Sequence, residues 1–169
     1  MRRPSGFTIV EIIVVLLLMS ILAVTVLGRS VTTSNLDLSS ATDKIRIQLR
    51  FAQAEAMKLS YETNLVWGIK SAGGQYWMFQ GINPDTQANE VRVPGGDYPG
   101  TSNRINHADL GQGVTVSGFT VFFDSIGKPY TAYSSRTVNT PLVSQMSITV
   151  SAGSDNRSIT VTPETGLIR

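Results

Sequence analysis

An apolar segment that carries one carboxylate constrains this chain more than any other feature. From Phe7 to Leu27 the side chains are almost all apolar, and Glu11 is the only charged one. A helix over this segment would be about 31 Å long, which is enough to cross a bilayer. Because a carboxylate is costly in lipid unless it is neutralised or paired, Glu11 is expected to have a partner and a function there.

The residues before the apolar segment predict its orientation. Arg2 and Arg3 precede it, and the positive-inside bias then places the N-terminus in the cytoplasm and the rest of the chain outside. A secretory signal has small residues at a cleavage site after its apolar region. No such site follows Leu27, and a small residue, Gly6, stands before the apolar segment instead.

Gly6, Phe7, Thr8 and Glu11, followed by the apolar segment, resemble the class III signal of type IV pilins and type II secretion pseudopilins. The resemblance implies that a prepilin peptidase cuts between Gly6 and Phe7 and methylates the new N-terminus, which becomes N-methylphenylalanine. It also implies a single-pass protein of the bacterial inner membrane, with a cytoplasmic N-terminus and a periplasmic C-terminal domain, that is incorporated into a pilus or pseudopilus.

The chemistry of Glu11 indicates how it would act in assembly. Cleavage would create an ammonium group at Phe7, and the Glu11 carboxylate of an incoming subunit would pair with that amine on a neighbour. A displaced register would leave both charges unpaired in an apolar bundle, so the pair would favour one register. The alternative is that Glu11 is protonated and has no role.

The charge balance argues against general nucleic-acid binding. The precursor has 14 Lys and Arg against 12 Asp and Glu, and its pI is about 9.1. Removal of Arg2 and Arg3 with the leader leaves 12 against 12 and no basic run. Attraction to phosphates would therefore need a local cationic patch.

The pattern of the whole chain predicts an α+β fold, in which a long N-terminal helix packs on a C-terminal antiparallel sheet. We expect four parts: a leader at 1–6, a transmembrane and filament-core helix at 7–28, an amphipathic helix at 29–60 and a β-rich globular domain at 61–169. Gly28 is expected to loosen the helix. Apolar residues at three- and four-residue steps predict the helix face that packs on the sheet, namely Ile45, Leu49, Ala52, Ala56 and Leu59.

Alternating apolar residues and glycine-rich turns predict the strands of the globular domain. They are expected at 63–69, 75–80, 114–123 with a bulge at Gly118, 130–133, 146–150 and 158–161. The polar segment 81–113 is expected to be a surface excursion with a short strand at 90–93. Four aromatic residues are expected in the sheet core rather than at an adhesive site, namely Trp67, Tyr76, Trp77 and Phe79.

Three further segments resemble the GspH/FimT family of minor pseudopilins and minor pilins: residues 49–57, 121–129 and 159–169. The resemblance implies a minor subunit that helps to initiate or cap a type II secretion pseudopilus or a type IV pilus, including mannose-sensitive haemagglutinin types. Its partners would be other pilin or pseudopilin subunits, the prepilin peptidase and an inner-membrane assembly platform. A major pilin is an alternative, which the absence of cysteine, and hence of a disulfide-closed loop, disfavours.

Another alternative is a minor pilin that binds DNA during uptake. Some family members do so through a Gly-Arg-x-Arg motif near the C-terminal hairpin, which would fall at 166–169. Here Leu167 replaces the first arginine and Arg169 remains. Other cations would have to complete the patch, namely Arg136, Arg157 and Lys128. No aromatic residues interleave with these cations as they do in single-strand binding platforms, so nucleic-acid binding is not expected.

The sequence offers little for catalysis or for binding a metal or cofactor. His107 is the only histidine and no cysteine is present, which excludes HExxH and thiolate sites. We expect His107 to be a solvated loop residue. Four acidic residues lack the spacing of a calcium-binding EF-hand and are expected only to keep the loop soluble, namely Asp85, Glu90, Asp97 and Asp109. The predictions are no enzyme, no cofactor and no metal site.

Overall fold

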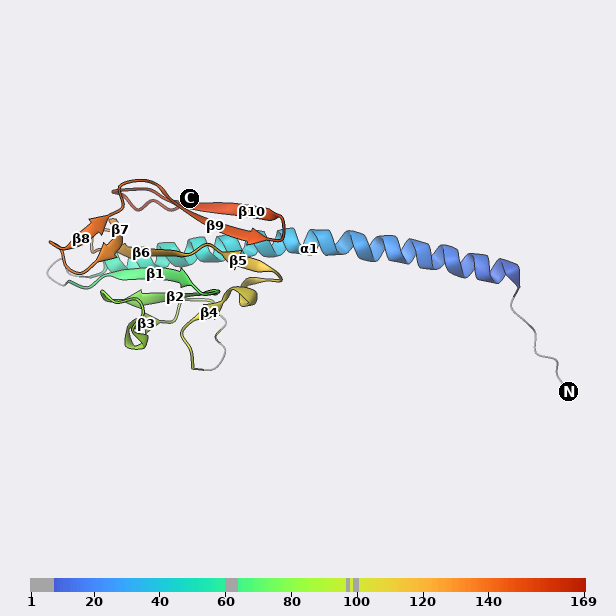
Figure 1. Ribbon diagram of the computed structural model, residues 1–169, viewed down its shortest axis with the longest axis horizontal. Helices are drawn as coiled ribbons and strands as arrows, with labels where there is room; N and C mark the ends of the chain where they lie inside the picture. Colours follow the sequence, from blue (N-terminus) through green and yellow to red (C-terminus); the bar gives the residue numbers. More distant parts are fainter. Residues whose placement is uncertain (1–7, 60–63, 97, 99–100) are drawn as a thin grey trace.

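One long helix and two antiparallel sheets form the protein (Figure 1). The computed structural model describes residues 8–59, 64–96, 98 and 101–169, and the side chains of residues 25–34 lie outside this description. Helix α1 spans Ile9–Met57. Its first half extends beyond the rest of the molecule, and its second half lies against the sheets (Figure 1). The predicted α+β fold is confirmed.

The larger sheet has seven strands in the order β3-β2-β1-β6-β7-β8, and β4 also pairs with β2. Its strands are β1 (Trp67–Ala72), β2 (Gln75–Gln80), β3 (Glu90–Val91), β4 (Ile105–Asn106), β6 (Phe119–Phe123), β7 (Pro129–Tyr133) and β8 (Asn139–Pro141). The smaller sheet has the order β10-β9-β5. Its strands are β5 (Val114–Val116), β9 (Met146–Ala152) and β10 (Asp155–Val161). Two short 3-10 helices, η1 (Gln87–Asn89) and η2 (His107–Leu110), complete the described elements.

The core forms where the second half of α1 meets both sheets. One apolar stripe of the helix is buried there, at Leu38, Ala41, Ile45, Leu49, Ala52 and Ala56. These residues follow each other in steps of three and four, which keeps them on one helix face. The predicted face is therefore correct except for Leu59, which is half-buried beyond the end of the helix.

Strand β2 contributes side chains to both faces of the larger sheet. Tyr76 and Met78 pack in the core beneath the helix, whereas Trp77 and Phe79 belong to a second apolar cluster. The alternation of side chains along a strand accounts for this division. The prediction that these aromatic residues form sheet core is confirmed, with Trp67 half-buried against the main cluster.

The predicted strand at 114–123 is wrong, because the chain changes sheets within it. Residues before Ser117 pair with β9, and those after Gly118 pair with β1. At the crossing, the Ser117 N–H donates to the Thr149 carbonyl over 2.8 Å, and the Thr149 N–H donates to Ser117 Oγ over 3.0 Å. Gly118 thus marks a change of sheet rather than a bulge within one strand.

Smaller differences concern the ends of elements. Helix α1 continues through Gly28 without interruption and ends at Met57. The first strand begins at Trp67, and part of its predicted start, Thr63, lies outside the described residues. The last hairpin is longer than predicted, because β9 and β10 pair in register as far as Ala152 and Asp155.

Candidate functional site

The start of α1 is an exposed apolar surface with one acidic residue. Thr8 caps the helix, since its Oγ1 accepts a hydrogen bond of 3.3 Å from the Glu11 N–H. All side chains from Thr8 to Val24 are exposed, including the large apolar ones. A helix that is apolar on every side needs apolar surroundings, which the rest of this chain does not supply. Glu11 lies in the first turn of this surface.

The predicted cleavage residues Gly6 and Phe7 lie outside the described residues. The predicted membrane span at 7–28 falls partly outside them as well, because the structure leaves out Phe7 and the side chains from Thr25 onward. Within the part of the chain that is described, no helical stretch combines the length and the apolar character that a membrane crossing requires.

The three segments that resemble GspH/FimT proteins meet on one side of α1. The Gln53 side-chain amide donates to the Gly127 carbonyl over 2.9 Å and to the Thr165 carbonyl over 3.1 Å. One turn earlier on the helix, the Arg50 guanidinium donates to the Ile168 carbonyl over 2.9 Å. The helix therefore holds the β6–β7 turn and the C-terminal segment together through two polar side chains.

The C-terminal segment also closes on itself. An isolated bridge joins Val161 to Ile168, and backbone hydrogen bonds of 3.0 Å run in both directions between Thr160 and Arg169. Gly166, which has φ +61°, forms the turn between them. The last residues of the chain are thus part of the fold.

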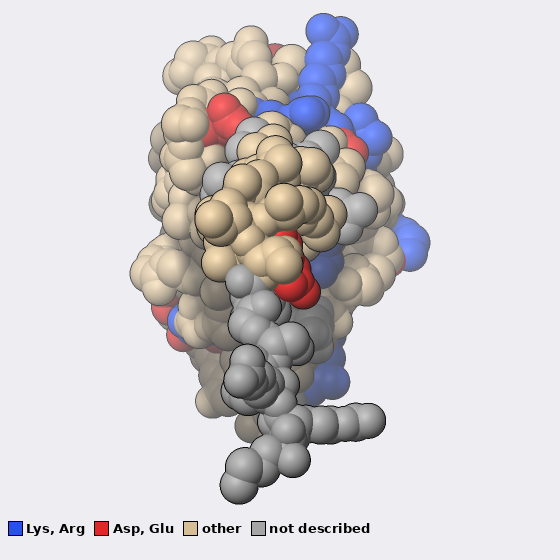
Figure 2. Space-filling model, turned by 90° about the vertical axis from the view of Figure 1, so that its right-hand side faces the viewer, with Lys and Arg blue, Asp and Glu red and all other residues tan. Residues whose placement is uncertain are grey.

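The structure does not gather the four cations considered for DNA binding into one patch, although Lys128 and Arg136 line one pocket. Arg136 lies in the β7–β8 loop, at the end of the molecule opposite the protruding helix, whereas the β9–β10 hairpin, with Arg157 on its second strand, turns at the near end (Figure 1). Arg169 lies beside Thr160 on the other edge of β10. Figure 2, seen along the helix, shows basic side chains interrupted by acidic ones and a mostly uncharged centre.

The acidic residues considered as calcium ligands each have another role where they are described. Asp85 pairs with Lys70 at 2.7 Å, and Glu90 pairs with Arg104 at 2.6 Å. Asp109 accepts a hydrogen bond of 3.2 Å from the Asn106 N–H within η2. Asp97 lies outside the described residues. Among the residues that the structure describes, no group of three or more potential ligands could hold a metal ion.

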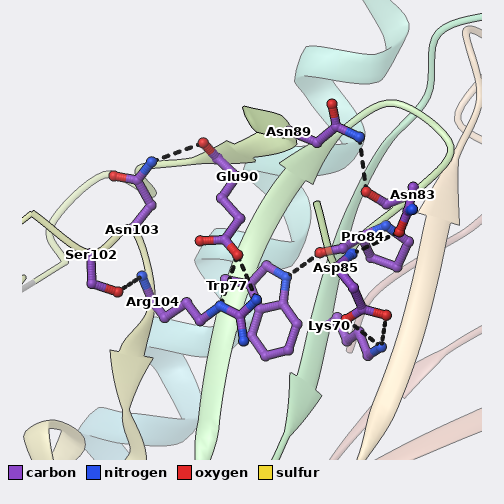
Figure 3. A network of polar contacts seen from close by, with 10 residues as sticks. All are labelled: Lys70, Trp77, Asn83, Pro84, Asp85, Asn89, Glu90, Ser102, Asn103 and Arg104. Atoms are coloured by element: carbon purple, nitrogen blue, oxygen red, sulfur yellow. Dashed lines mark hydrogen bonds and ion pairs between the residues drawn. The ribbon is translucent and has the colours of Figure 1, made fainter. Parts of the chain in front are cut away.

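Polar contacts hold the excursion at 81–113 on the outer face of the sheet (Figure 3). The Arg104 guanidinium lies 4.0 Å from the Trp77 ring centre and donates twice to one Glu90 oxygen, over 2.6 and 2.8 Å. Trp77 Nε1 donates to the Pro84 carbonyl over 2.6 Å. The Glu90 side chain is only 4% exposed, so its charge depends on Arg104 for compensation. The predicted surface excursion is therefore an ordered part of the domain where it is described.

His107 is buried, and the prediction that it is a solvated loop residue is wrong. Its Nδ1 accepts a hydrogen bond of 3.2 Å from the Val116 N–H, and its Nε2 lies 3.3 Å from Ser71 Oγ. Since Nδ1 is an acceptor, the neutral ring carries its proton on Nε2. Burial lowers the pKa of His107 below its ordinary value of 6.5. The polar neighbours Asn106 and Asp109 misled the prediction, because they cap η2 while His107 points inward.

Comparison with known proteins bears on the N-terminal segment. Residues 1–27 match the family described as the prokaryotic N-terminal methylation motif. This motif indicates a type IV pilin-like protein. It is typical of pilins and pseudopilins that a prepilin peptidase processes, that are anchored in the inner membrane by this segment and that assemble with pilin subunits. Such proteins are generally structural subunits without enzymatic activity. The match makes no assignment to the GspH/FimT family, and no curated protein and no solved structure matches the chain.

Proposed function

We propose that this pilin-like protein is a minor pilin or pseudopilin of the GspH/FimT type, which helps to initiate or cap a type II secretion pseudopilus or a type IV pilus. The observation that carries the proposal is the methylation motif at 1–27, within which α1 begins and exposes apolar side chains on every face up to Val24. Such a surface is stable first in lipid and then among the helices of neighbouring subunits.

The proposed assignment to the GspH/FimT type rests on the three segments that resemble proteins of that family. They are far apart in the sequence, and Gln53 and Arg50 join them on one side of α1. Sequence segments that recur throughout a family are expected to contact one another when the fold of that family depends on them. The contacts support the proposal for this reason, since the residues that make them lie outside the N-terminal motif.

Glu11 is proposed to select the docking register. It is exposed in the first turn of α1 and is the only charged side chain between Thr8 and Val24. In an assembled filament its carboxylate would pair with the methylated N-terminal amine at Phe7 of a neighbouring subunit. Because both groups are costly to leave unpaired in an apolar bundle, a subunit in another register would dock less stably.

The first experiment measures the intact mass of the membrane-extracted protein, with and without a co-expressed prepilin peptidase. We expect the loss of residues 1–6 and the gain of one methyl group only when the peptidase is present. Gly6→Val serves as the control that blocks cleavage while the apolar segment stays unchanged. An uncut wild-type chain in the presence of an active peptidase would contradict the proposal.

The second experiment separates processing from assembly. Glu11→Gln keeps the size of the side chain and removes its charge, so we expect normal cleavage but at least about a tenfold loss of incorporation into sheared filaments. Glu55→Gln is the matched control, because Glu55 lies on the same helix and pairs with the exposed Lys58. Equal incorporation of both variants would refute the role of Glu11.

A further inference from the structure

The outer edge of strand β10 is covered along only part of its length. This strand is the last of the smaller sheet, and Figure 1 shows it at the margin of the molecule. Residues 167–169 lie along its second half, where Thr160 and Arg169 exchange two backbone hydrogen bonds of 3.0 Å. The first half, at 155–158, is exposed. The edge therefore holds one antiparallel segment of this chain and has room beside it for another strand.

The pairing pattern shows which backbone groups of β10 face this edge. Successive residues of an antiparallel strand direct their N–H and C=O groups to alternate sides. The Ser117 N–H donates to the Thr149 carbonyl over 2.8 Å, so Thr149 faces β5 and its partner in β10, Ser158, faces outward. Thr160 faces outward as well, toward the C-terminal segment, and the same alternation places Asn156 on the edge. The N–H and C=O groups of Asn156 and Ser158 have no backbone partner among the described residues.

Two other sheet edges are protected by contacts or residues of their own. On β5, the Val116 N–H donates to His107 Nδ1 over 3.2 Å. On β8, Pro141 has no N–H to donate. A regular, exposed edge without such protection readily pairs with a strand of another chain. Since β9 and β10 pair in continuous register up to their turn, the free half of β10 is such an edge.

The side chains beside the free backbone groups define the charges that an added strand should carry. Arg157 lies between Asn156 and Ser158, is exposed, and pairs with none of the described acidic residues. The residue of an added antiparallel strand opposite Arg157 would lie only about 4.5 Å away between Cα atoms. Opposite charges attract at such a position and like charges repel. Asp155 lies on the same face two residues earlier, so a cation is favoured opposite it.

A second copy of this chain does not meet both requirements. In one register Asn156 of each chain bonds to Ser158 of the other, and all four backbone groups are paired. Each Arg157 then lies opposite the Arg157 of the other chain, which is unfavourable. In the register that sets Arg157 opposite Asp155, Ser158 lies opposite the turn residue Ser154, so only the Asn156 groups are bonded. A different partner can satisfy the backbone groups and the charges together.

We propose that the edge of β10 at 155–158 binds an extended segment of another protein as an additional antiparallel strand. The segment carries an acidic residue opposite Arg157 and, two positions later, a basic residue opposite Asp155. Backbone hydrogen bonds to Asn156 and Ser158 supply the affinity, and the two charges fix the register. The edge is remote in the sequence from Glu11 and the methylation motif, so the proposal does not rest on the proposed function.

Amide hydrogen exchange measured by NMR tests strand addition directly, with isotope-labelled full-length protein in detergent micelles. The probe is the peptide Gly-Val-Thr-Glu-Thr-Lys-Gly, acetylated and amidated at its ends, at millimolar concentration. We expect it to slow the exchange of the Asn156 and Ser158 amides at least about tenfold. The Arg157 and Ile159 amides face β9, so they are protected with and without the peptide and serve as internal controls.

Modified peptides separate the contribution of the backbone from that of the charges. N-methylation of both threonines removes the donors that face β10 and should abolish the protection. A peptide in which Glu and Lys are exchanged keeps its composition and net charge but places like charges opposite Arg157 and Asp155. We expect it to bind at least about fivefold more weakly.

Variants of the protein locate the binding site. The double variant Asp155→Lys with Arg157→Glu should reverse the preference and bind the exchanged peptide more tightly. Lys44→Glu is the matched control, because it alters a cation on α1 beside Pro94, away from β10. It should leave the preference unchanged. An unchanged thermal unfolding midpoint in each variant verifies that the fold is retained.

Three outcomes would overturn the proposal. The first is unchanged exchange at Asn156 and Ser158 in the presence of the peptide, and the second is equal protection by the original and the exchanged peptides. The third is protection that appears without peptide and grows with protein concentration, which would assign the edge to a second copy. None of these measurements involves cleavage by the peptidase or incorporation into filaments, so failure here is distinct from failure of the proposed function.

Discussion

Gly166 combines two demands that only glycine meets. Its φ of +61° lies in the left-handed region, and a Cβ there would be 2.5 Å from both Gln53 Nε2 and the Gly127 carbonyl. The first demand concerns the local backbone, and the second concerns the packing of the C-terminal turn on the β6–β7 turn and α1. A second glycine, Gly153, has nearly the same φ, +62°, with open space around it.

The two glycines are expected to differ in the stability that is lost when each is replaced by alanine. Gly153→Ala should lower the free energy of unfolding by about 1 kcal/mol, from backbone strain alone. Gly166→Ala should cost at least about 2 kcal/mol more, because a carbonyl and the Gln53 amide have to move. Urea unfolding of both variants measures the difference, and equal costs would show that the C-terminal turn is not closely packed.

His107 gives the folded protein a dependence on pH. Its pKa is lowered by burial, so the unfolded chain binds the proton more readily than the folded one. The stability that the neutral ring contributes is complete above about pH 6.5, the ordinary pKa. It is lost as the pH falls from there through the lowered pKa of the folded state. A protonated Nδ1 could also no longer accept the hydrogen bond that the Val116 N–H donates to it when the ring is neutral.

We therefore expect wild-type protein to lose more stability between pH 7.5 and pH 5 than the His107→Asn variant. The Asn oxygen can take the place of Nδ1 as acceptor for the Val116 N–H and does not titrate in this range. Urea unfolding of both chains at several pH values provides the comparison. A parallel pH dependence in the two chains would exclude His107 as its source.

Among the elements, segment 81–113 between β2 and β5 is attached to the larger sheet by its two short strands. Strands β3 and β4 both pair with β2, at residues 78–79 and 75–76 respectively. Strands of two residues provide few backbone hydrogen bonds, so side chains must supply the rest. Arg104 does so by lying between the Trp77 ring and the buried Glu90 carboxylate (Figure 3).

Replacing Arg104 alone should therefore lower the free energy of unfolding more than replacing both Arg104 and Glu90. Arg104→Met leaves the Glu90 charge buried without compensation, and we expect a loss of about 3 kcal/mol in the free energy of unfolding. The double variant with Glu90→Gln should recover much of it. Lys70→Met, which breaks a more exposed pair with Asp85, should cost less than about 1 kcal/mol. Additive costs in the double-mutant cycle would contradict the coupling.

The whole molecule divides into a protruding apolar helix and a domain with its own core. Asp37 of α1 contacts the domain, since its Oδ2 accepts a hydrogen bond of 3.4 Å from the Gln112 N–H. Leu38, the first helix residue whose side chain is described as buried, follows directly. Every buried apolar residue of the described chain lies from there onward. Among the side chains that the structure describes, α1 therefore contributes to the core from Leu38 onward.

A fragment that begins at Asn35 is therefore expected to fold cooperatively and stay monomeric without detergent, whereas the full chain requires detergent. Circular dichroism with thermal unfolding, together with sedimentation velocity, tests both statements. Aggregation of the fragment, or unfolding without a sigmoidal transition, would mean that the first half of α1 contributes to the stability of the domain.

Features that depend on local order along the chain could be predicted from the amino-acid sequence. The apolar segment with Glu11 predicted the methylation motif, and three- and four-residue steps identified the buried face of α1 at Ile45, Leu49, Ala52 and Ala56. Alternation and turn residues predicted the first and last hairpins. Such patterns are readable because the period of a helix or a strand appears directly in the order of the residues.

The contacts between residues that are distant in the sequence could not be predicted in this way. Residues 114–123 were predicted to form one strand, but the second half pairs with β1 in the larger sheet and the first half pairs with β9 in the smaller one. Burial of His107, the compensation of Glu90 by Arg104 and the pocket between Lys128 and Arg136 arise in the same way. Each depends on contacts between segments that are far apart in the sequence, and such contacts produce no periodic pattern in the order of the residues. Tertiary packing alone therefore determines them.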